Sequence, residues 1–157
     1  KRPDPASSPR PLPTPTRTMT PTKPHRLLLF VSGLVAVAIG AALVVDPFAF
    51  HATNQIALGT DPSLISEVRA PGGLLLVLGL MILHGARRAS FAVPATALTA
   101  ALYLSYGVAR LVSLAVDGLP ATGLVVATGI ELLLGVAAGW TLGRVLSRDR
   151  GPSCATP

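Results

Sequence analysis

The chain has 157 residues, of which half are hydrophobic and only 13% are charged, and its mean hydropathy is +0.60. Soluble domains carry about 25% charged residues, so the composition indicates an integral membrane protein. The formal net charge of +6 does not indicate a nucleic-acid-binding protein, because eleven of the thirteen Lys and Arg residues lie outside the apolar segments and are not interleaved with aromatic residues.

Both ends of the chain are polar. Residues 1–26 include eight prolines together with Ser, Thr and basic residues. Such a segment neither propagates a helix nor buries apolar area, so we expect a disordered, Pro-rich basic arm. Residues 147–157 are expected to be a disordered tail, and Cys154 in that tail has no second cysteine with which to form an internal disulfide.

The first spanning helix is predicted over residues 27–45. This stretch contains no charged residue and, at about 1.5 Å per residue, is long enough to cross a hydrocarbon layer of roughly 30 Å. A cleaved signal peptide is the alternative interpretation. The apolar run is longer than the usual signal-peptide core of about 7 to 15 residues, which favours an uncleaved helix.

Three further spanning helices are predicted over residues 64–83, 91–116 and 119–142. Asp61 before Pro62 is the pattern of an N-cap followed by proline at the first helical position. Gly118 and Pro120 form a tight reversal between the last two helices. Residues 27–146 are therefore predicted to form one all-α domain, an integral membrane four-helix bundle.

The distribution of Lys and Arg predicts the orientation of the bundle. The N-terminal arm has six of these residues, the turn between the second and third helices has two, and the C-terminal tail has three. The connections 46–63 and 117–120 have none. Under the positive-inside rule, both termini are cytoplasmic, which indicates a multi-pass protein of the cell's inner (cytoplasmic) membrane with the lipid bilayer as its partner.

Polar side chains form a single line along the third helix. They recur every three or four residues, which places them on one helix face: Thr96, Thr99, Tyr103, Tyr106, Arg110, Ser113 and Asp117. We call this line the polar seam. The remaining residues are almost all Ala, Leu or Val, so we interpret the seam as facing the interior of the bundle, with Thr96 and Thr99 bonding their own backbone carbonyls.

Four ionisable residues lie within the predicted helices: Glu67, Arg69, Arg110 and Glu131. An unpaired charge near a helix centre costs about 2.5 to 3.5 kcal/mol, so intramembrane salt bridges are expected. Glu131 is predicted to lie about one turn deeper than Arg110, which a long arginine side chain can span. Either Glu131 lies between Arg110 and Arg69, or Glu67 pairs with one of the arginines.

Six glycines are candidates for helix packing: Gly72, Gly73, Gly107, Gly135, Gly139 and Gly143. Small residues three or four positions apart allow helices to approach closely in lipid. The last three repeat every four residues on the fourth helix. They serve either packing within the bundle or contact with another copy of the chain or a membrane partner.

Several of these landmarks resemble a known family. The segment Ser66-Glu67-Val68-Arg69-Ala70 before Gly72-Gly73, then Gly107 to Leu111, Asp117-Gly118 and Glu131-Leu132-Leu133, are similar to the bacterial membrane family catalogued as domain of unknown function 4345. The resemblance covers about residues 27–146. It departs at Ser66, where the family usually has Asn, and at Pro71.

The resemblance implies a four-helix membrane protein and implies that Glu67, Arg69, Arg110 and Glu131 are signature residues, without implying an activity. A looser similarity is to the DoxX-like four-helix membrane proteins.

Two functional hypotheses follow. In the first, an outward-facing polar cavity binds or transports a small ligand or ion, and the candidate residues are Glu67, Arg69, Tyr103, Tyr106, Arg110 and Glu131. In the second, the chain is a structural or accessory subunit whose salt bridges serve packing alone. The three histidines lie far apart, and no phosphate loop or nucleophilic triad is present. We therefore expect no metal, no cofactor and no enzymatic activity, and an intramembrane acid or base role for Glu131 is the least favoured alternative.

Overall fold

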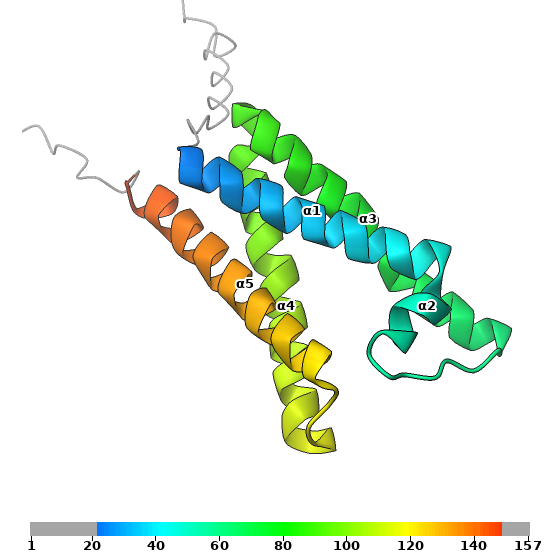
Figure 1. The fold of residues 1–157 in the computed structure, drawn as a ribbon. Helices are drawn as coiled ribbons and strands as arrows, with labels where there is room; N and C mark the ends of the chain where they lie inside the picture. Colours follow the sequence, from blue (N-terminus) through cyan, green and yellow to red (C-terminus); the bar gives the residue numbers. More distant parts are fainter. Residues whose placement is uncertain (1–21, 149–157) are drawn as a thin grey trace, which may run out of the picture.

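The computed structural model describes residues 22–148. Its elements are the helices α1 (Lys23–Val45), α2 (Pro47–Ala52), α3 (Pro62–Arg87), α4 (Ala92–Asp117) and α5 (Thr122–Arg148), with the short 3-10 helix η1 (Ala89–Phe91) before α4 (Figure 1). No strand occurs in this part of the chain. Four helices, α1, α3, α4 and α5, are long and apolar enough to cross a membrane. The predicted all-α, four-helix membrane architecture is confirmed, and the chain is a multi-pass membrane protein.

The helix boundaries differ from the predictions mainly at the ends of the domain. The predicted arm and tail lie outside the described residues, except that residues 23–26 belong to α1 and residues 147–148 to α5. The carboxylate of Asp61 caps α3 by accepting hydrogen bonds from the backbone N–H groups of Ser63 (2.9 Å) and Leu64 (3.1 Å). Gly118 ends α4 at a φ of 93°, which favours glycine.

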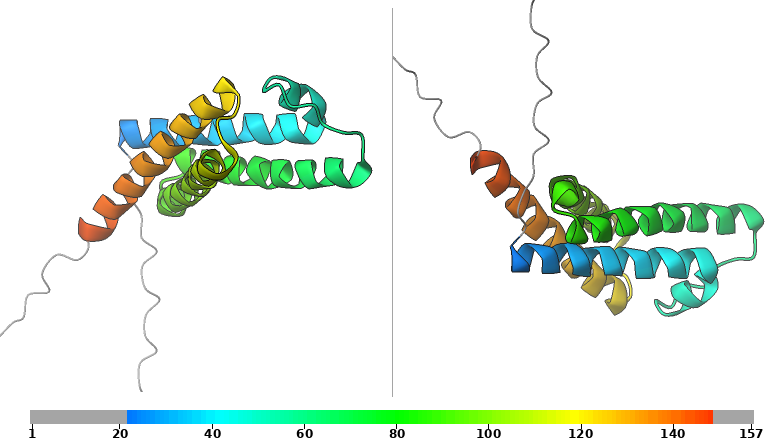
Figure 2. Two further views of the ribbon diagram at one scale, coloured as in Figure 1. Left: turned by 90° about the horizontal axis from the view of Figure 1, so that it is seen from below. Right: turned by 90° about the horizontal axis from the view of Figure 1, so that it is seen from above.

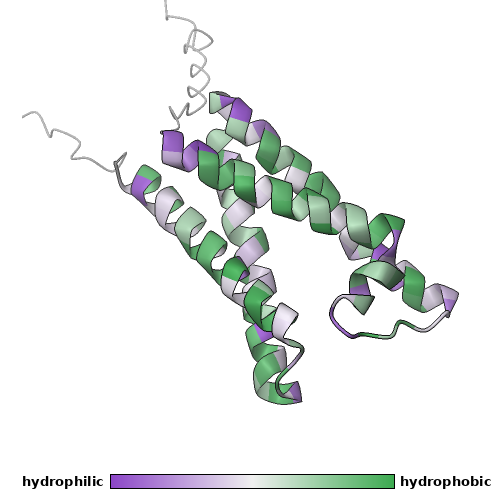
Figure 3. Cartoon of the chain, viewed as in Figure 1, coloured by the Kyte–Doolittle hydropathy of each residue, from purple (hydrophilic) through white to green (hydrophobic). Residues whose placement is uncertain are grey.

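The four long helices form two antiparallel pairs, α1 with α3 and α4 with α5 (Figures 1 and 2). The pairs meet where α3 leads into α4, at the end of the bundle that includes the first turn of α1 and that we call the base, and α5 crosses α1 obliquely (Figure 2). The pairs diverge toward the other end, which carries α2 and the α4–α5 turn and which we call the loop end. Green, hydrophobic stretches dominate the long helices in Figure 3, and hydrophilic residues gather near the helix ends.

Glycines bring α1 and α3 together. A Cβ atom on Gly40 would lie 2.5 Å from the backbone nitrogen of Leu76 and 2.7 Å from the backbone oxygen of Gly72. A Cβ on Gly33 would similarly lie 3.0 Å from the backbone oxygen of Gly79. Gly33, Gly40 and Gly79 were not among the predicted packing glycines. The sequence pattern that indicates these contacts is a spacing of seven residues between the glycines of each helix, which places them on one face toward a partner helix.

Only some of the predicted packing glycines pack within the described chain. Gly107 faces Leu132, and Gly135 faces Leu104, so these two glycines bring α4 and α5 together. Gly72 packs against Leu43 of α1. Around Gly73, Gly139 and Gly143, by contrast, no atom lies within 4 Å of a would-be Cβ. These three face outward, because they lie on the sides of α3 and α5 that no other described helix covers.

Candidate functional site

A cavity of about 550 Å³ lies between the two helix pairs. All four long helices contribute to its lining, and so do α2 and the loop after it up to residue 56, which together we call the α2 segment. Val35, Ile39, Leu75, Leu102 and Ile130 are among its apolar residues. The polar residues are His51, Asn54, Glu67, Tyr103, Tyr106, Arg110 and Glu131. The cavity exists because the pairs diverge toward the loop end, so the side chains of one pair do not fill the space against the other.

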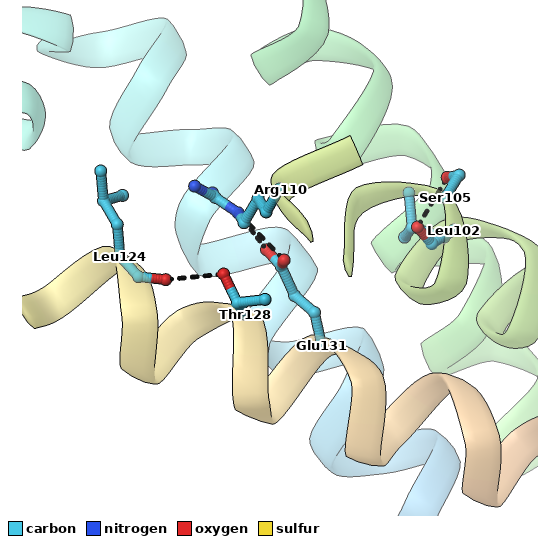
Figure 4. A network of polar contacts seen from close by, with 6 residues as sticks. All are labelled: Leu102, Ser105, Arg110, Leu124, Thr128 and Glu131. Atoms are coloured by element: carbon cyan, nitrogen blue, oxygen red, sulfur yellow. Dashed lines mark hydrogen bonds and ion pairs between the residues drawn. The ribbon is translucent and has the colours of Figure 1, made fainter. Parts of the chain in front are cut away.

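Arg110 and Glu131 form an ion pair across the α4–α5 hairpin (Figure 4). The Nε atom of Arg110 lies 3.1 Å from Oε1 and 3.0 Å from Oε2 of Glu131. The Glu131 side chain is 12% exposed and the Arg110 side chain 34% exposed. The two terminal nitrogens of the guanidinium make no hydrogen bond to the described residues, and Figure 4 shows them pointing away from Glu131. They are therefore available to donate to an acceptor inside the cavity.

The polar seam is only partly inside the bundle: its last two residues, Ser113 and Asp117, are exposed and bond each other (2.8 Å), so the prediction of an inward-facing seam is wrong for them. Near the base, Thr96 and Thr99 donate hydrogen bonds to the backbone oxygens of Ala92 (2.7 Å) and Ala95 (2.8 Å) on their own helix. Toward the loop end, the hydroxyl of Tyr103 donates to the backbone oxygen of Ser32 on α1. The Tyr106 hydroxyl makes no hydrogen bond with the described residues and lines the cavity. The free polar groups of the seam, on Tyr106 and Arg110, thus lie in its middle part.

His25 joins the seam at the base, although the sequence analysis assigned it to the arm. Its Nε2 atom lies 2.7 Å from the Oγ1 atom of Thr96. Because the Thr96 hydroxyl already donates to Ala92, His25 Nε2 must donate to Thr96. The Nδ1 atom of His25 and the hydroxyl of Ser32 are buried without a partner in the described part of the chain. This contact joins α1 to α4 where the two helix pairs converge.

Glu67 and Arg69 lie on different sides of α3. Glu67 lines the cavity and forms no ion pair with the described residues. Arg69 lies in a separate groove on the outer surface, beside Val44 and Ser66. The predicted pairing of Glu131 with Arg69 is therefore absent from the structure, and so is the alternative pairing of Glu67 with an arginine within this range. The side chains of two residues that are two positions apart on a helix point roughly 200° apart around its axis. The side chains of Glu67 and Arg69 therefore do not enter the same cavity.

The sequence analysis also missed the role of the α2 segment. His51 donates a hydrogen bond from Nδ1 to the backbone oxygen of Pro47 (2.8 Å), which leaves its Nε2 atom as an acceptor. Asn54 lies against the start of α5, since a Cβ on Gly123 would lie 2.7 Å from its Oδ1 atom. The segment therefore reaches from one helix pair to the other. Its signal was Asp46 before Pro47, the same capping pattern that predicted α3.

The charges in the cavity restrict its chemistry. The formal charges of Glu67, Glu131 and Arg110 at pH 7 sum to −1. No group of three His, Cys, Asp or Glu side chains within residues 22–148 is placed to hold a metal ion. The arrangement offers donors from Arg110 and Tyr106 and acceptors from Glu67 and His51, set in a mostly apolar wall.

Comparisons with known proteins identify a family over most of the chain. The family model described as Domain of unknown function (DUF4345) matches residues 24–142. The searches of curated proteins and of solved structures found no match.

Proposed function

The chain belongs to the DUF4345 family, whose description assigns no activity, and we propose from the geometry that its cavity binds a small amphipathic molecule. The observation that carries this proposal is a set of polar groups that have no partner among the described residues and that border a mostly apolar cavity. Arg110 and Tyr106, both partly buried, and Glu67, which is exposed, border that space. Unpaired polar groups inside a bundle are costly unless water or a ligand satisfies them.

The size and charge of the cavity define the ligand class. A volume of about 550 Å³ suits a molecule of drug-like size. The apolar lining, with Val35, Leu75 and Leu102, matches a hydrocarbon or ring body. The summed charge of −1 disfavours a simple anion. The proposed ligand therefore has an apolar body and a neutral or cationic polar group that accepts a hydrogen bond from Arg110 or donates one to Glu67.

The proposed side of entry is the loop end. Lys23, Arg26, Arg87, Arg88 and Arg144 all lie toward the base. By the positive-inside rule we place the base in the cytoplasm and the loop end on the outer side of the inner membrane. The α2 segment then stands at the outer mouth of the cavity, where His51 and Asn54 contact an entering molecule.

Native mass spectrometry of the full chain, purified from its membranes in mild detergent, tests the proposal. We expect a co-purifying molecule of a few hundred daltons, within the size range of such cavities. Ala127→Trp fills the cavity from α5 and is expected to remove that molecule. The matched control is Val126→Trp, because Val126 is the adjacent residue, is 56% exposed and does not line the cavity. Equal retention of the molecule by both variants would contradict the proposal.

A structural or accessory role is the second candidate. It is supported by the outward-facing Gly139 and Gly143, beside Trp140, which is 64% exposed. A second copy or a membrane partner can pack closely on such a surface. Crosslinking in native membranes from a cysteine at Gly139, in a Cys154→Ser background, is expected to give a dimer or a mixed complex if this role is correct. Recovery of the monomer alone would exclude this surface as a contact with a second copy or a membrane partner.

A further inference from the structure

Arg69 lies on the membrane-facing surface without a partner. It is exposed and makes no hydrogen bond or ion pair with residues 22–148. It lies in a shallow, open groove formed by α3, on its side away from the cavity, and by Val44 of α1. An arginine charge facing hydrocarbon opposes insertion by about 2.5 to 3.5 kcal/mol near the membrane centre. Such a charge is stable near the polar interface, where an anionic group from outside the chain can pair with it.

The depth of Arg69 indicates where that partner lies. Helix α3 has 26 residues, which corresponds to about 39 Å, or about 4 to 5 Å beyond each side of a 30 Å hydrocarbon layer. Arg69 is seven residues after Pro62, so its Cα lies about 6 Å below the loop-end boundary. Helical side chains lean toward the helix N-terminus, which is the loop end here. The guanidinium of Arg69 therefore reaches the loop-end boundary of the hydrocarbon layer, just below the lipid phosphates.

The surroundings of Arg69 fit one phospholipid molecule. Ser66 is one turn nearer the loop end on the same side and has a hydroxyl that bonds no other residue of the described part. The groove contains no acidic side chain, since Glu67 faces the cavity. Deeper in the membrane, Ala70 and Gly73 leave the helix surface flat, with nothing within 4 Å of a Cβ on Gly73. The polar end of the groove thus matches a phosphate, and its small apolar residues match an acyl chain.

We propose that this groove is a phospholipid-binding site in which Arg69 and Ser66 bind the phosphate and the first part of an acyl chain lies over Ala70 and Gly73. The site is on the opposite side of α3 from the cavity and does not depend on the cavity's ligand. The lipid phosphate supplies the negative charge that no residue described in the chain supplies to Arg69.

The test is native mass spectrometry of the delipidated full chain in a neutral detergent, titrated with palmitoyl-oleoyl phosphatidylglycerol. Diacylglycerol with the same chains and inorganic phosphate are the comparison ligands. We expect Arg69→Gln and Gly73→Phe each to weaken phosphatidylglycerol binding at least five-fold. The double variant should bind phosphatidylglycerol only slightly more weakly than either single variant, because both changes act on one site. Leu74→Phe is the matched control for bulk, since Leu74 is 58% exposed and lies outside the groove.

The two comparison ligands separate the phosphate from the acyl chains. Diacylglycerol binding should not respond to Arg69→Gln, and inorganic phosphate should not displace the lipid. Arg69→Lys, which keeps the charge but loses the two-pronged donor, is expected to give intermediate binding and serves if Arg69→Gln does not fold. Unchanged lipid binding by Arg69→Gln or by Gly73→Phe would overturn the proposal. Full competition with the lipid by inorganic phosphate would also overturn it. The same holds if Arg69→Gln changes the size of the complex in native membranes but leaves lipid binding unaltered.

Discussion

The two helix pairs are held together in different ways. The α1–α3 pair packs through Gly33, Gly40, Gly72 and Gly79, with backbone atoms close to one another and no ion pair between the two helices in the described part. The α4–α5 pair also has a glycine contact, at Gly107 and Gly135, but it adds the Arg110–Glu131 ion pair near the point where the helix pairs diverge.

This difference separates the structural part of the molecule from its candidate site. The α1–α3 pair is a closely packed unit with one free charged side chain facing the cavity, Glu67. The α4–α5 pair supplies most of the cavity's polar groups, from Tyr103, Tyr106, Arg110 and Glu131. We infer that changes at the glycines of α1 and α3 affect stability first, whereas changes at the polar groups of α4 and α5 affect the cavity first.

The largest effect is expected for Gly40→Val. Its Cβ would collide with backbone atoms of α3, which cannot move as a flexible side chain can. We expect a loss of about 3 kcal/mol in the free energy of unfolding, measured by SDS titration in mixed micelles. Gly73→Val is the control, because a Cβ there meets nothing within 4 Å. Similar losses for both variants would show that the α1–α3 contact is not specific.

A smaller effect is expected from breaking the ion pair. Glu131→Gln leaves the Arg110 guanidinium without its anionic partner and should lower the free energy of unfolding by about 2 kcal/mol. Arg110→Gln should have a similar effect, and the double variant should lose less than the sum, with a coupling energy of about 1 to 2 kcal/mol. Additive losses would mean that the two side chains do not interact in the membrane.

The smallest effects on stability are expected at the two tyrosines of the polar seam. Tyr103→Phe removes the hydrogen bond to the Ser32 carbonyl, so we expect a loss of about 0.6 to 1 kcal/mol in the free energy of unfolding. Tyr106→Phe removes a hydroxyl that bonds no described residue, so stability should change by less than about 0.5 kcal/mol. The same denaturation assay measures both. A larger loss for Tyr106→Phe would reveal a partner for its hydroxyl.

The fold was largely predictable from the sequence because spanning helices have a minimum length and leave a simple apolar signal. The seven-residue periodicity of the polar seam likewise placed Tyr103, Tyr106 and Arg110 on one face, and all three line the cavity. Prediction was weaker where a contact depends on the rotation of one helix against another. Both arginines, for example, were equally suited to Glu131 by depth, and only the direction of Arg69 around α3 separates them.

Neither α2 nor the burial of His25 was predicted, because the residues concerned also fit a simpler interpretation. Asp46 and Pro47 follow the first predicted helix directly and lie in the predicted connection 46–63, but they also cap and begin α2. Likewise, His25 was included in the basic arm because of its polar neighbours, whereas it is buried against Thr96.

The most direct test of the central claim is the reactivity of single cysteines toward a charged, membrane-impermeant thiol reagent. In a Cys154→Ser background, Ala127→Cys places a thiol in the cavity and Val126→Cys places one on the adjacent outer face. If the space between the helix pairs is an open, hydrated site, Ala127→Cys should react from the loop-end side of the membrane at least ten times faster than Val126→Cys. Equal, slow reaction of both cysteines would show that the space is closed to water and would contradict the account.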